Sequence, residues 1–410
     1  MSKRELKILL LLASAQFTNI VDFMIMMPLE PQLVRMFGIT PVQFSLLVAS
    51  YSLSAGVSAI FSSFFVDDYD RKKSFLLIYL GFLVGTLLCA SSPSFEILLA
   101  ARVFTGFFGG VMGSQIMSIV GDIIHPNFRG RAMGVIMGSF SAASVLGVPM
   151  GLFIAAHMTW HAPFYSLVAI GTVVFIFAFK TLPPMKAHLK MDSKKRSKTE
   201  IYSYIWARPK LIWALSLFPM LMLAHFTVIP FISPYMSANI GFTDAELSYI
   251  YFCGGAFTIV SSQLVGRWVD KTSSYHVFKI LAFMALIPIF ALTHLPPVPI
   301  WVALVITTTF FVIGSSRMIA AMTAVTGCIE PRFRGGFMSI NTALQQLGSG
   351  VASFIAGLMV VRAEDGKLLH YNWTSYVVLV ATFGCLYIFK QFKDLKVQPA
   401  VDPIPPEPVA

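Results

Sequence analysis

Charged side chains of opposite sign lie deep within two long apolar stretches of this sequence. Asp22 belongs to the stretch 8–29, and Arg102 belongs to the stretch 95–124. A carboxylate beside a guanidinium keeps its charge, whereas a carboxylate alone in an apolar environment takes up a proton. The two residues therefore indicate either a carboxylate that exchanges a proton or a permanent buried ion pair that holds two segments together.

A second group of polar side chains is spread over other apolar stretches. Arg317 could bind an anionic or polar group, or it could pair with Glu330. His225 could act in proton transfer or could be a hydrogen-bonded core residue. For the amides in this group, hydrogen bonds between helices are the alternative to contact with a small molecule. The remaining candidates for a small-molecule site are Asn19, Met26, Gln115, Asn341 and Gln345.

The sequence contains no arrangement typical of an enzyme. We find no nucleophile–base–acid set, no glycine-rich phosphate loop and no spacing of His, Cys and Glu typical of a metal site. The four cysteines all lie within apolar stretches, as small core residues do. We therefore expect neither catalysis nor a cofactor nor a bound metal. A sensor is not expected either, since no soluble domain accompanies the apolar stretches.

The elements that must position these residues are apolar helices. Hydrophobic residues make up 56% of the 410 residues, charged residues make up 12%, and the mean hydropathy is +0.75. A segment that crosses a bilayer needs roughly 20 residues and must satisfy its own backbone hydrogen bonds, which favours helices. Twelve spans are predicted, at 8–29, 42–66, 74–92, 95–124, 132–156, 162–180, 211–236, 246–268, 277–295, 299–328, 337–361 and 371–391.

The spans divide into two groups of six around one long polar stretch. Asp22 and Arg102 would lie at similar depths in the first group, so we expect them to pair. The predicted fold is an all-α integral membrane protein of two six-helix bundles. Its parts are a first bundle at 1–181, a cytoplasmic linker at 182–210, a second bundle at 211–393 and a disordered tail at 394–410.

Positive charge is concentrated in segments that would lie on one side of the membrane. The net charge is +11, and with a cytoplasmic N-terminus all but five of the 30 Lys and Arg residues fall in cytoplasmic segments. This bias is typical of membrane proteins and places both termini in the cytoplasm. The expected partner of this charge is the lipid bilayer and not a nucleic acid. The exceptions are Arg35, Arg362 and Lys367 on the outside, and Arg102 and Arg317 within spans.

Two short motifs recur at nearly the same interval. The segment HPNFRGRAM at 125–133 is matched by EPRFRGGFM at 330–338, which lies 205 residues later. Asp67, at the end of the second span, is matched by Asp270, 203 residues later at the end of the eighth. Two matches at one interval indicate two related halves in parallel orientation, as in one large class of transporters.

With these motifs, the chain resembles the major facilitator superfamily over almost its whole length. The loop after the second span is similar to the signature G-x-x-x-D-R-x-G-R-R/K, with Asp67, Arg71 and Lys72 in place and three departures at other positions. The segment RVFTG at 102–106 is similar to the motif R-x-x-Q-G. The segment 138–151 resembles the antiporter motif of the bacterial drug and metabolite:proton antiporter branch.

The resemblance implies roles for particular residues. In the antiporter branch, the residues that correspond to Asp22 and Arg102 take part in proton coupling. The resemblance also implies that Asp67 caps the eleventh span and that Arg71 reaches Asp122. The gating loops of the two halves would contain Asp67, Arg71, Asp122, Arg129, Arg267, Asp270, Glu330 and Arg334.

Small residues in the fifth span predict close packing between helices. Gly138, Gly147 and Gly151 would let a neighbouring helix approach closely, and Pro149 should kink the span. In a protein whose two halves must move, such contacts would serve both packing and motion.

The features together predict a secondary active transporter. The first hypothesis is proton-coupled efflux of small organic molecules by alternating access, in a monomer that lies in a bacterial inner (plasma) membrane. The alternative is export or facilitated transport of a sugar or nucleoside without strict proton antiport, for which Asn19, Gln115 and Gln345 would matter most.

Overall fold

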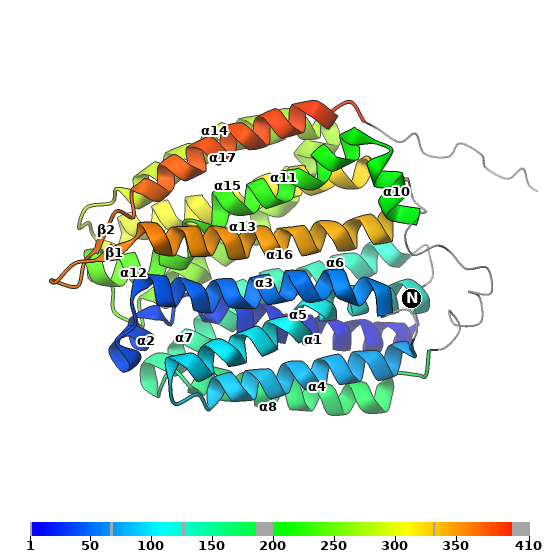
Figure 1. The fold of residues 1–410 in the computed structure, drawn as a ribbon, viewed down its shortest axis with the longest axis horizontal. Helices are drawn as coiled ribbons and strands as arrows, with labels where there is room; N and C mark the ends of the chain where they lie inside the picture. Colours follow the sequence, from blue (N-terminus) through cyan, green and yellow to red (C-terminus); the bar gives the residue numbers. More distant parts are fainter. Residues whose placement is uncertain (1, 66–68, 125–127, 186–199, 331–332, 396–410) are drawn as a thin grey trace, which may run out of the picture.

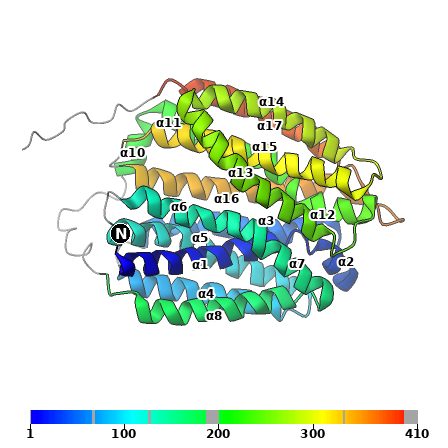
Figure 2. The same ribbon diagram turned by 180° about the vertical axis from the view of Figure 1, so that it is seen from behind.

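The computed structural model describes residues 2–65, 69–124, 128–185, 200–330 and 333–395. Within these ranges, the chain forms long helices that run side by side along the molecule (Figures 1 and 2). The first residues, helix α10 (Glu200–Trp206) and the end of the last helix lie together at one end of the bundle. We call this end the termini side. The opposite end, which carries helix α2 (Glu30–Phe37) and a short strand pair, is the hairpin side.

The first bundle contains six spanning helices. Helix α3 packs on α5, α5 and α8 both pack on α4, and α1 packs on α6. The fifth span begins as α6, passes through the π-helical turn η3 and continues as α7. The bounds are α1 Lys3–Ile25, α3 Pro41–Phe65, α4 Arg71–Ala90, α5 Phe95–Ile123, α6 Arg129–Ala142, η3 Ala143–Gly147, α7 Val148–His157 and α8 Ala162–Thr181.

The second bundle repeats this arrangement with a more broken first span. Helix α15 packs on α13 and α14, and α11 packs on α16 and α17. The bounds are α11 Pro209–Phe226, η4 Ile229–Phe231, α12 Ile232–Tyr235, η5 Met236–Ile240, α13 Leu247–Lys271, α14 Ser274–Thr293, α15 Ile300–Gly327, α16 Arg334–Met359 and α17 Trp373–Phe392. Before α17, the strands β1 (Val361–Arg362) and β2 (Leu368–Leu369) pair antiparallel, with Val361 opposite Leu369.

Ten of the twelve spans are long and apolar enough to cross a membrane on composition alone, and the other two are α13 and α16. These two helices make the most extensive contacts between the bundles, because α16 packs along α3 and α13 packs against η3 and α7. A Cβ on Gly350 of α16 would lie 2.7 Å from Leu53 of α3, so the two helices touch closely. Helices that face protein need fewer apolar side chains than helices that face lipid, which explains their lower hydropathy.

The fifth span matches the packing prediction only in part. A Cβ on Gly147 would overlap Val21 of α1, and one on Gly151 would lie 2.7 Å from Ile25 of the same helix. A Cβ on Gly138 would meet nothing within 4 Å, so the prediction of close packing at Gly138 is wrong. The π-helical turn directly before α7 accommodates Pro149, which cannot donate a backbone hydrogen bond.

Two predicted segments lie partly outside the described residues. The linker predicted at 182–210 contains α10, and the tail predicted at 394–410 is described only as far as residue 395. Helix α2 and the β1–β2 pair lie in loops for which no element was predicted.

Candidate functional site

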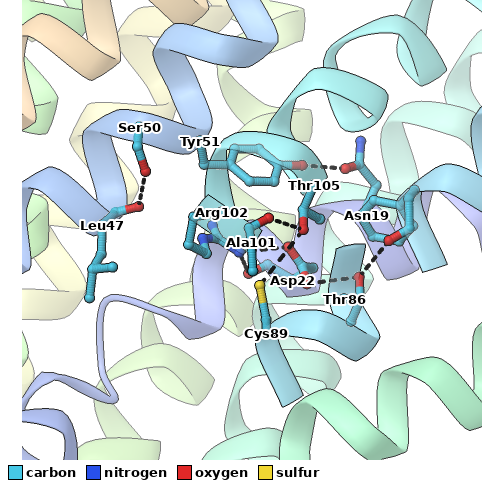
Figure 3. Close-up of polar contacts among 11 residues, drawn as sticks. Asn19, Asp22, Leu47, Ser50, Tyr51, Thr86, Cys89, Ala101, Arg102 and Thr105 are labelled. Atoms are coloured by element: carbon cyan, nitrogen blue, oxygen red, sulfur yellow. Dashed lines mark hydrogen bonds and ion pairs between the residues drawn. The ribbon is translucent and has the colours of Figure 1, made fainter. Parts of the chain in front are cut away.

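Asp22 and Arg102 form a fully buried ion pair inside the first bundle (Figure 3). The Nη1 of Arg102 donates to Oδ2 of Asp22 at 2.8 Å and to the backbone carbonyl of Asp22 at 3.3 Å. Asp22 lies in the last turn of α1, and Arg102 lies near the start of α5, so the pair is close to the hairpin side. The pairing expected from their similar depths is therefore present.

Other side chains complete the surroundings of this pair. The hydroxyl of Thr86, on α4, donates to Oδ1 of Asp22 at 3.1 Å. The guanidinium of Arg102 lies 4.4 Å from the centre of the Tyr51 ring, an arrangement that is attractive for a cation. The Nε and Nη2 of Arg102 have no hydrogen-bond partner among the described residues. The arginine thus keeps donors available beyond its one carboxylate.

Tyr51 links this pair to Asn19, one of the predicted site residues. The Tyr51 hydroxyl donates to Oδ1 of Asn19 at 2.5 Å (Figure 3). The Nδ2 of Asn19 donates to the carbonyl of Gly109 at 3.3 Å. The close approach requires a glycine, because a Cβ at position 109 would overlap the Tyr51 hydroxyl. Asn19, Tyr51 and the ion pair therefore form one polar chain between α1, α3 and α5.

The second bundle contains its own buried arginine, in α15. Arg317 is 1% exposed, and its Nη2 contacts Nδ1 of His225 on α11 at 3.2 Å. A guanidinium can only donate, so Nδ1 accepts and the imidazole carries its proton on Nε2. Gly314 makes room for this ring, since a Cβ there would overlap Nε2 of His225. Two of the predicted residues are thus brought together.

Glu330 is not the partner of Arg317. One Oε1 atom of Glu330 accepts from the Tyr204 hydroxyl at 2.8 Å and lies 4.0 Å from Nη2 of Arg208. Both partners belong to the segment around α10, which was predicted only as a linker. No carboxylate of the described residues pairs with Arg317, so the expected alternative of a pair with Glu330 is wrong.

Apart from Asn19, the predicted amides have polar atoms without a partner within the described part of the chain; Gln115 and Asn341 are buried and Gln345 is half-buried. Both side-chain polar atoms of Gln115 and of Asn341 are unpaired, and so is Nε2 of Gln345. Asn341 lies two helical turns before Gly348, which packs on Pro219 of α11, so it shares the face of α16 that meets α11. Met26 lies fully buried in the apolar core, and its side chain makes no hydrogen bond to a described residue.

Aromatic rings join the two bundles near these polar residues. The ring of Phe23, on α1, lies 5.9 Å from that of Phe226 on α11, and it also lies 5.3 Å from the ring of Tyr51. Nearer the hairpin side, Phe44 of α3 and Phe231 of η4 meet edge to face at 6.0 Å. The contact between the bundles is therefore apolar and aromatic at this level.

Two ion pairs connect the bundles on the hairpin side. Arg362 of β1 donates to Oε1 of Glu30 at 2.6 Å, and Arg35 of α2 donates to Asp244 at 2.5 Å. Glu30 is only 1% exposed, and burial raises the pKa of this carboxyl to about 7 although Arg362 acts in the opposite direction. The pairs join the two bundles directly and close them together on this side.

On the termini side, the predicted gating residues are only partly brought together. Nε of Arg71 donates to Oδ2 of Asp122 at 2.9 Å, as the resemblance implied. Asp67 and the side chain of Arg129 lie outside the described residues. The side chains of Arg267, Asp270 and Arg334 are exposed.

Several residues of these polar clusters were not predicted from the sequence. Tyr51 and Thr86 complete the Asp22 site, and Glu30 and Arg362 connect the bundles. A tyrosine within a span is inconspicuous among 13 Tyr and 37 Phe residues. A carboxylate just after the first span, at Glu30, was the one available signal.

The comparisons with known proteins agree with this architecture. A sequence model described as Major Facilitator Superfamily matches residues 12–314 and, in a second alignment, residues 220–408. The chain is 25% identical over 348 residues to YceJ, an uncharacterized MFS-type transporter of Bacillus subtilis (strain 168), covering 84% of this chain and 87% of that protein. It is 23% identical to Multidrug resistance protein 3 of the same organism, covering 80% and 74%.

A solved structure shows the same fold. It is the bacterial homolog to the human lysosomal transporter Spinster, in an inward-facing and unoccupied conformation. The two structures match with a TM-score of 0.78 at 16% sequence identity, covering 98% of this chain and all of that chain. The chain therefore belongs to the major facilitator superfamily and is a multi-pass membrane transporter of small molecules, not an enzyme.

Proposed function

We propose that this chain is a proton-coupled exporter of small organic molecules that works by alternating access between its two bundles. The observation that carries the proposal is the fully buried pair of Asp22 and Arg102. Ionisable residues inside membrane spans are costly and usually mark a functional site. The likeness to Multidrug resistance protein 3 supports efflux as the direction of transport.

The pair supplies a physical route to coupling. While Asp22 contacts Arg102, the ionised carboxylate is favoured by the neighbouring positive charge. If the helices α1 and α5 separate during the cycle, the isolated carboxylate in an apolar bundle favours the protonated form. Each pKa unit of difference between two arrangements corresponds to about 1.4 kcal/mol, so proton uptake by a buried carboxylate can bias one arrangement of the bundles over the other.

The proposal includes an orientation and a set of moving contacts. The termini side lies in the cytoplasm of a bacterial plasma membrane, and the protein acts as a monomer with a gate on each side. The contacts of Glu30 with Arg362 and of Arg35 with Asp244 form across the closed hairpin side and are broken when it opens. On the termini side, the gate is formed by Asp67, Arg71, Asp122, Arg129, Arg267, Asp270, Glu330 and Arg334.

The test uses the protein reconstituted in liposomes with a pH-sensitive dye trapped inside. Gradients of ethidium, chloramphenicol and 1-naphthoate are imposed in turn, and proton movement is followed together with uptake of each compound. The parent protein is expected to exchange protons for at least one compound. The variant Asp22→Asn is expected to lose transport driven by a pH gradient and to keep its fold and compound binding.

A matched substitution separates coupling from a general effect of lost charge. Asp365, in the β1–β2 connection, is exposed, and its one ion pair among the described residues is with the neighbouring Lys367. Asp365→Asn should transport like the parent. Gradient-driven transport by Asp22→Asn at the parent's rate would contradict the coupling role. Transport without proton movement by the parent would favour the facilitated alternative.

A further inference from the structure

The two buried arginines differ in the groups that compensate for their positive charge. Arg102 has a carboxylate at 2.8 Å, whereas the side-chain partner of Arg317 within the described ranges is the neutral imidazole of His225 at 3.2 Å. The Nε of Arg317 has no partner among the described residues. A buried cation without a counter-charge is expensive, and buried charges in proteins are normally paired or bound to a ligand.

The position of Arg317 does not suggest a structural requirement of the fold. At the interval of 205 residues that relates the halves, the first bundle has Met112 at the corresponding position, and Met112 is fully buried in the apolar core. The same helix position can therefore hold an uncharged side chain of similar length. The charge at position 317 is specific to the second bundle.

The side chains around Arg317 suit the apolar part of an organic anion. Phe310 lies 6.0 Å from the His225 ring, and the neighbouring Phe226 reaches Phe23 of the first bundle. His225 is 8% exposed while Arg317 is 1% exposed, so a ligand would meet the imidazole before the guanidinium. One cation beside a neutral imidazole can balance one negative charge. Rings near it would contact an apolar, flat body.

We propose that Arg317 and His225 recognise the carboxylate of an aromatic monocarboxylate, which is the class of substrate that this transporter carries. The inference rests on the proposed export function, because it names the substrate of that transport. The carboxylate accepts from the guanidinium, whose fork geometry suits two carboxylate oxygens. The Asn341 amide lies on the α11-facing side of α16 and has no partner among the described residues. It would form a hydrogen bond with the substrate on the way to the termini side.

The experiment measures binding to the purified full-length protein by its thermal melting. The probes are 1-naphthoate and its neutral counterpart 1-naphthamide, which share size and ring. We expect 1-naphthoate to raise the melting temperature in a saturable way and to bind at least tenfold more tightly than 1-naphthamide, as loss of a charged hydrogen bond implies.

Two variants and a control locate the binding. Arg317→Met should lose the response to 1-naphthoate and, without ligand, melt no lower than the parent. Arg317→Lys keeps the charge and loses the fork, so its affinity should be intermediate; it also serves if the methionine variant does not fold. The control Lys390→Met removes an exposed cation from α17 and should respond like the parent.

Three results would overturn the inference. These are equal affinity for the acid and the amide, an undiminished response in Arg317→Met, and no saturable response to 1-naphthoate in the parent. Asp22→Asn distinguishes this inference from the proposed coupling. If the substrate inference holds and the coupling fails, Asp22→Asn and the parent both bind 1-naphthoate and both transport it equally. If only the substrate inference fails, proton exchange persists with another compound.

Discussion

Each of the two bundles buries one arginine, and the two arginines differ in the groups that compensate for their charge. Arg102 has a carboxylate partner, a cation–π contact with Tyr51 and a backbone carbonyl. Arg317 has one imidazole nitrogen. Positions related by the internal repeat hold neutral residues, Thr307 for Arg102 and Met112 for Arg317. The doubled architecture therefore carries two unlike polar centres, one balanced within the protein and one not.

In both bundles, however, a glycine leaves space for a polar ring next to the helix that carries the buried arginine. Gly109 in α5 leaves space for the Tyr51 hydroxyl, and Gly314 in α15 leaves space for His225. These glycines are 205 residues apart and so correspond in the repeat. The repeat conserves the space between the helices, while the side chains that fill it determine the chemistry.

Removing the arginine of the Asp22–Arg102 pair should lower stability more than any other substitution considered. Arg102→Gln leaves Asp22 buried without a counter-charge, so we expect a loss of about 3–5 kcal/mol in the free energy of unfolding. Arg317→Gln, which strands no carboxylate, should cost far less. Chemical denaturation in detergent micelles measures both, and the double variant Asp22→Asn/Arg102→Gln should recover much of the loss. Equal losses in the two single variants would refute the distinction between the centres.

The pair of Glu30 with Arg362 lies between the bundles instead of within one, and it should respond to pH. Glu30 has a pKa of about 7 when buried against Arg362, compared with 4.5 for an ordinary glutamate. Between pH 4.5 and about 7, the closed hairpin side therefore binds a proton that an open, hydrated Glu30 does not bind. Lowering the pH through this window should favour closure by up to about 3 kcal/mol.

Spin labels on α2 at position 36 and in the β1–β2 connection at position 367 report this closure as a distance. The distance should shorten as the pH falls from 8 to 5. Glu30→Gln should abolish the pH dependence, and Asp365→Asn should leave it unchanged. A hairpin side that opens on acidification would contradict the assignment.

Substituting the glycines that face Tyr51 and His225 should have a smaller effect on stability. Gly109→Ala and Gly314→Ala should each lower stability by about 1–3 kcal/mol, because the added methyl overlaps a polar ring. Gly113→Ala in the same helix as Gly109 meets nothing within 4 Å and should gain up to about 1 kcal/mol from helix propensity. The melting temperatures of the three variants measure these changes in stability. A loss in Gly113→Ala as large as in Gly109→Ala would remove the steric explanation.

The sequence alone determined the twelve helices, their grouping and the pairing of Asp22 with Arg102. These follow from the length of apolar stretches and from depth along a span, which are one-dimensional properties that sequence position records directly. The repeat added the relation between the halves. Hydropathy was weakest for α13 and α16, because the contact between bundles lets these helices be less apolar.

Only the tertiary structure decided which side chains meet around each charge. Arg317 meets His225 and not Glu330, and Glu30 meets Arg362 across 332 residues of sequence. Such contacts depend on how each helix is rotated about its axis and on where glycines allow close approach. A difference of one residue turns a side chain by about 100°, which hydropathy and spacing in a nearly uniform apolar span do not fix.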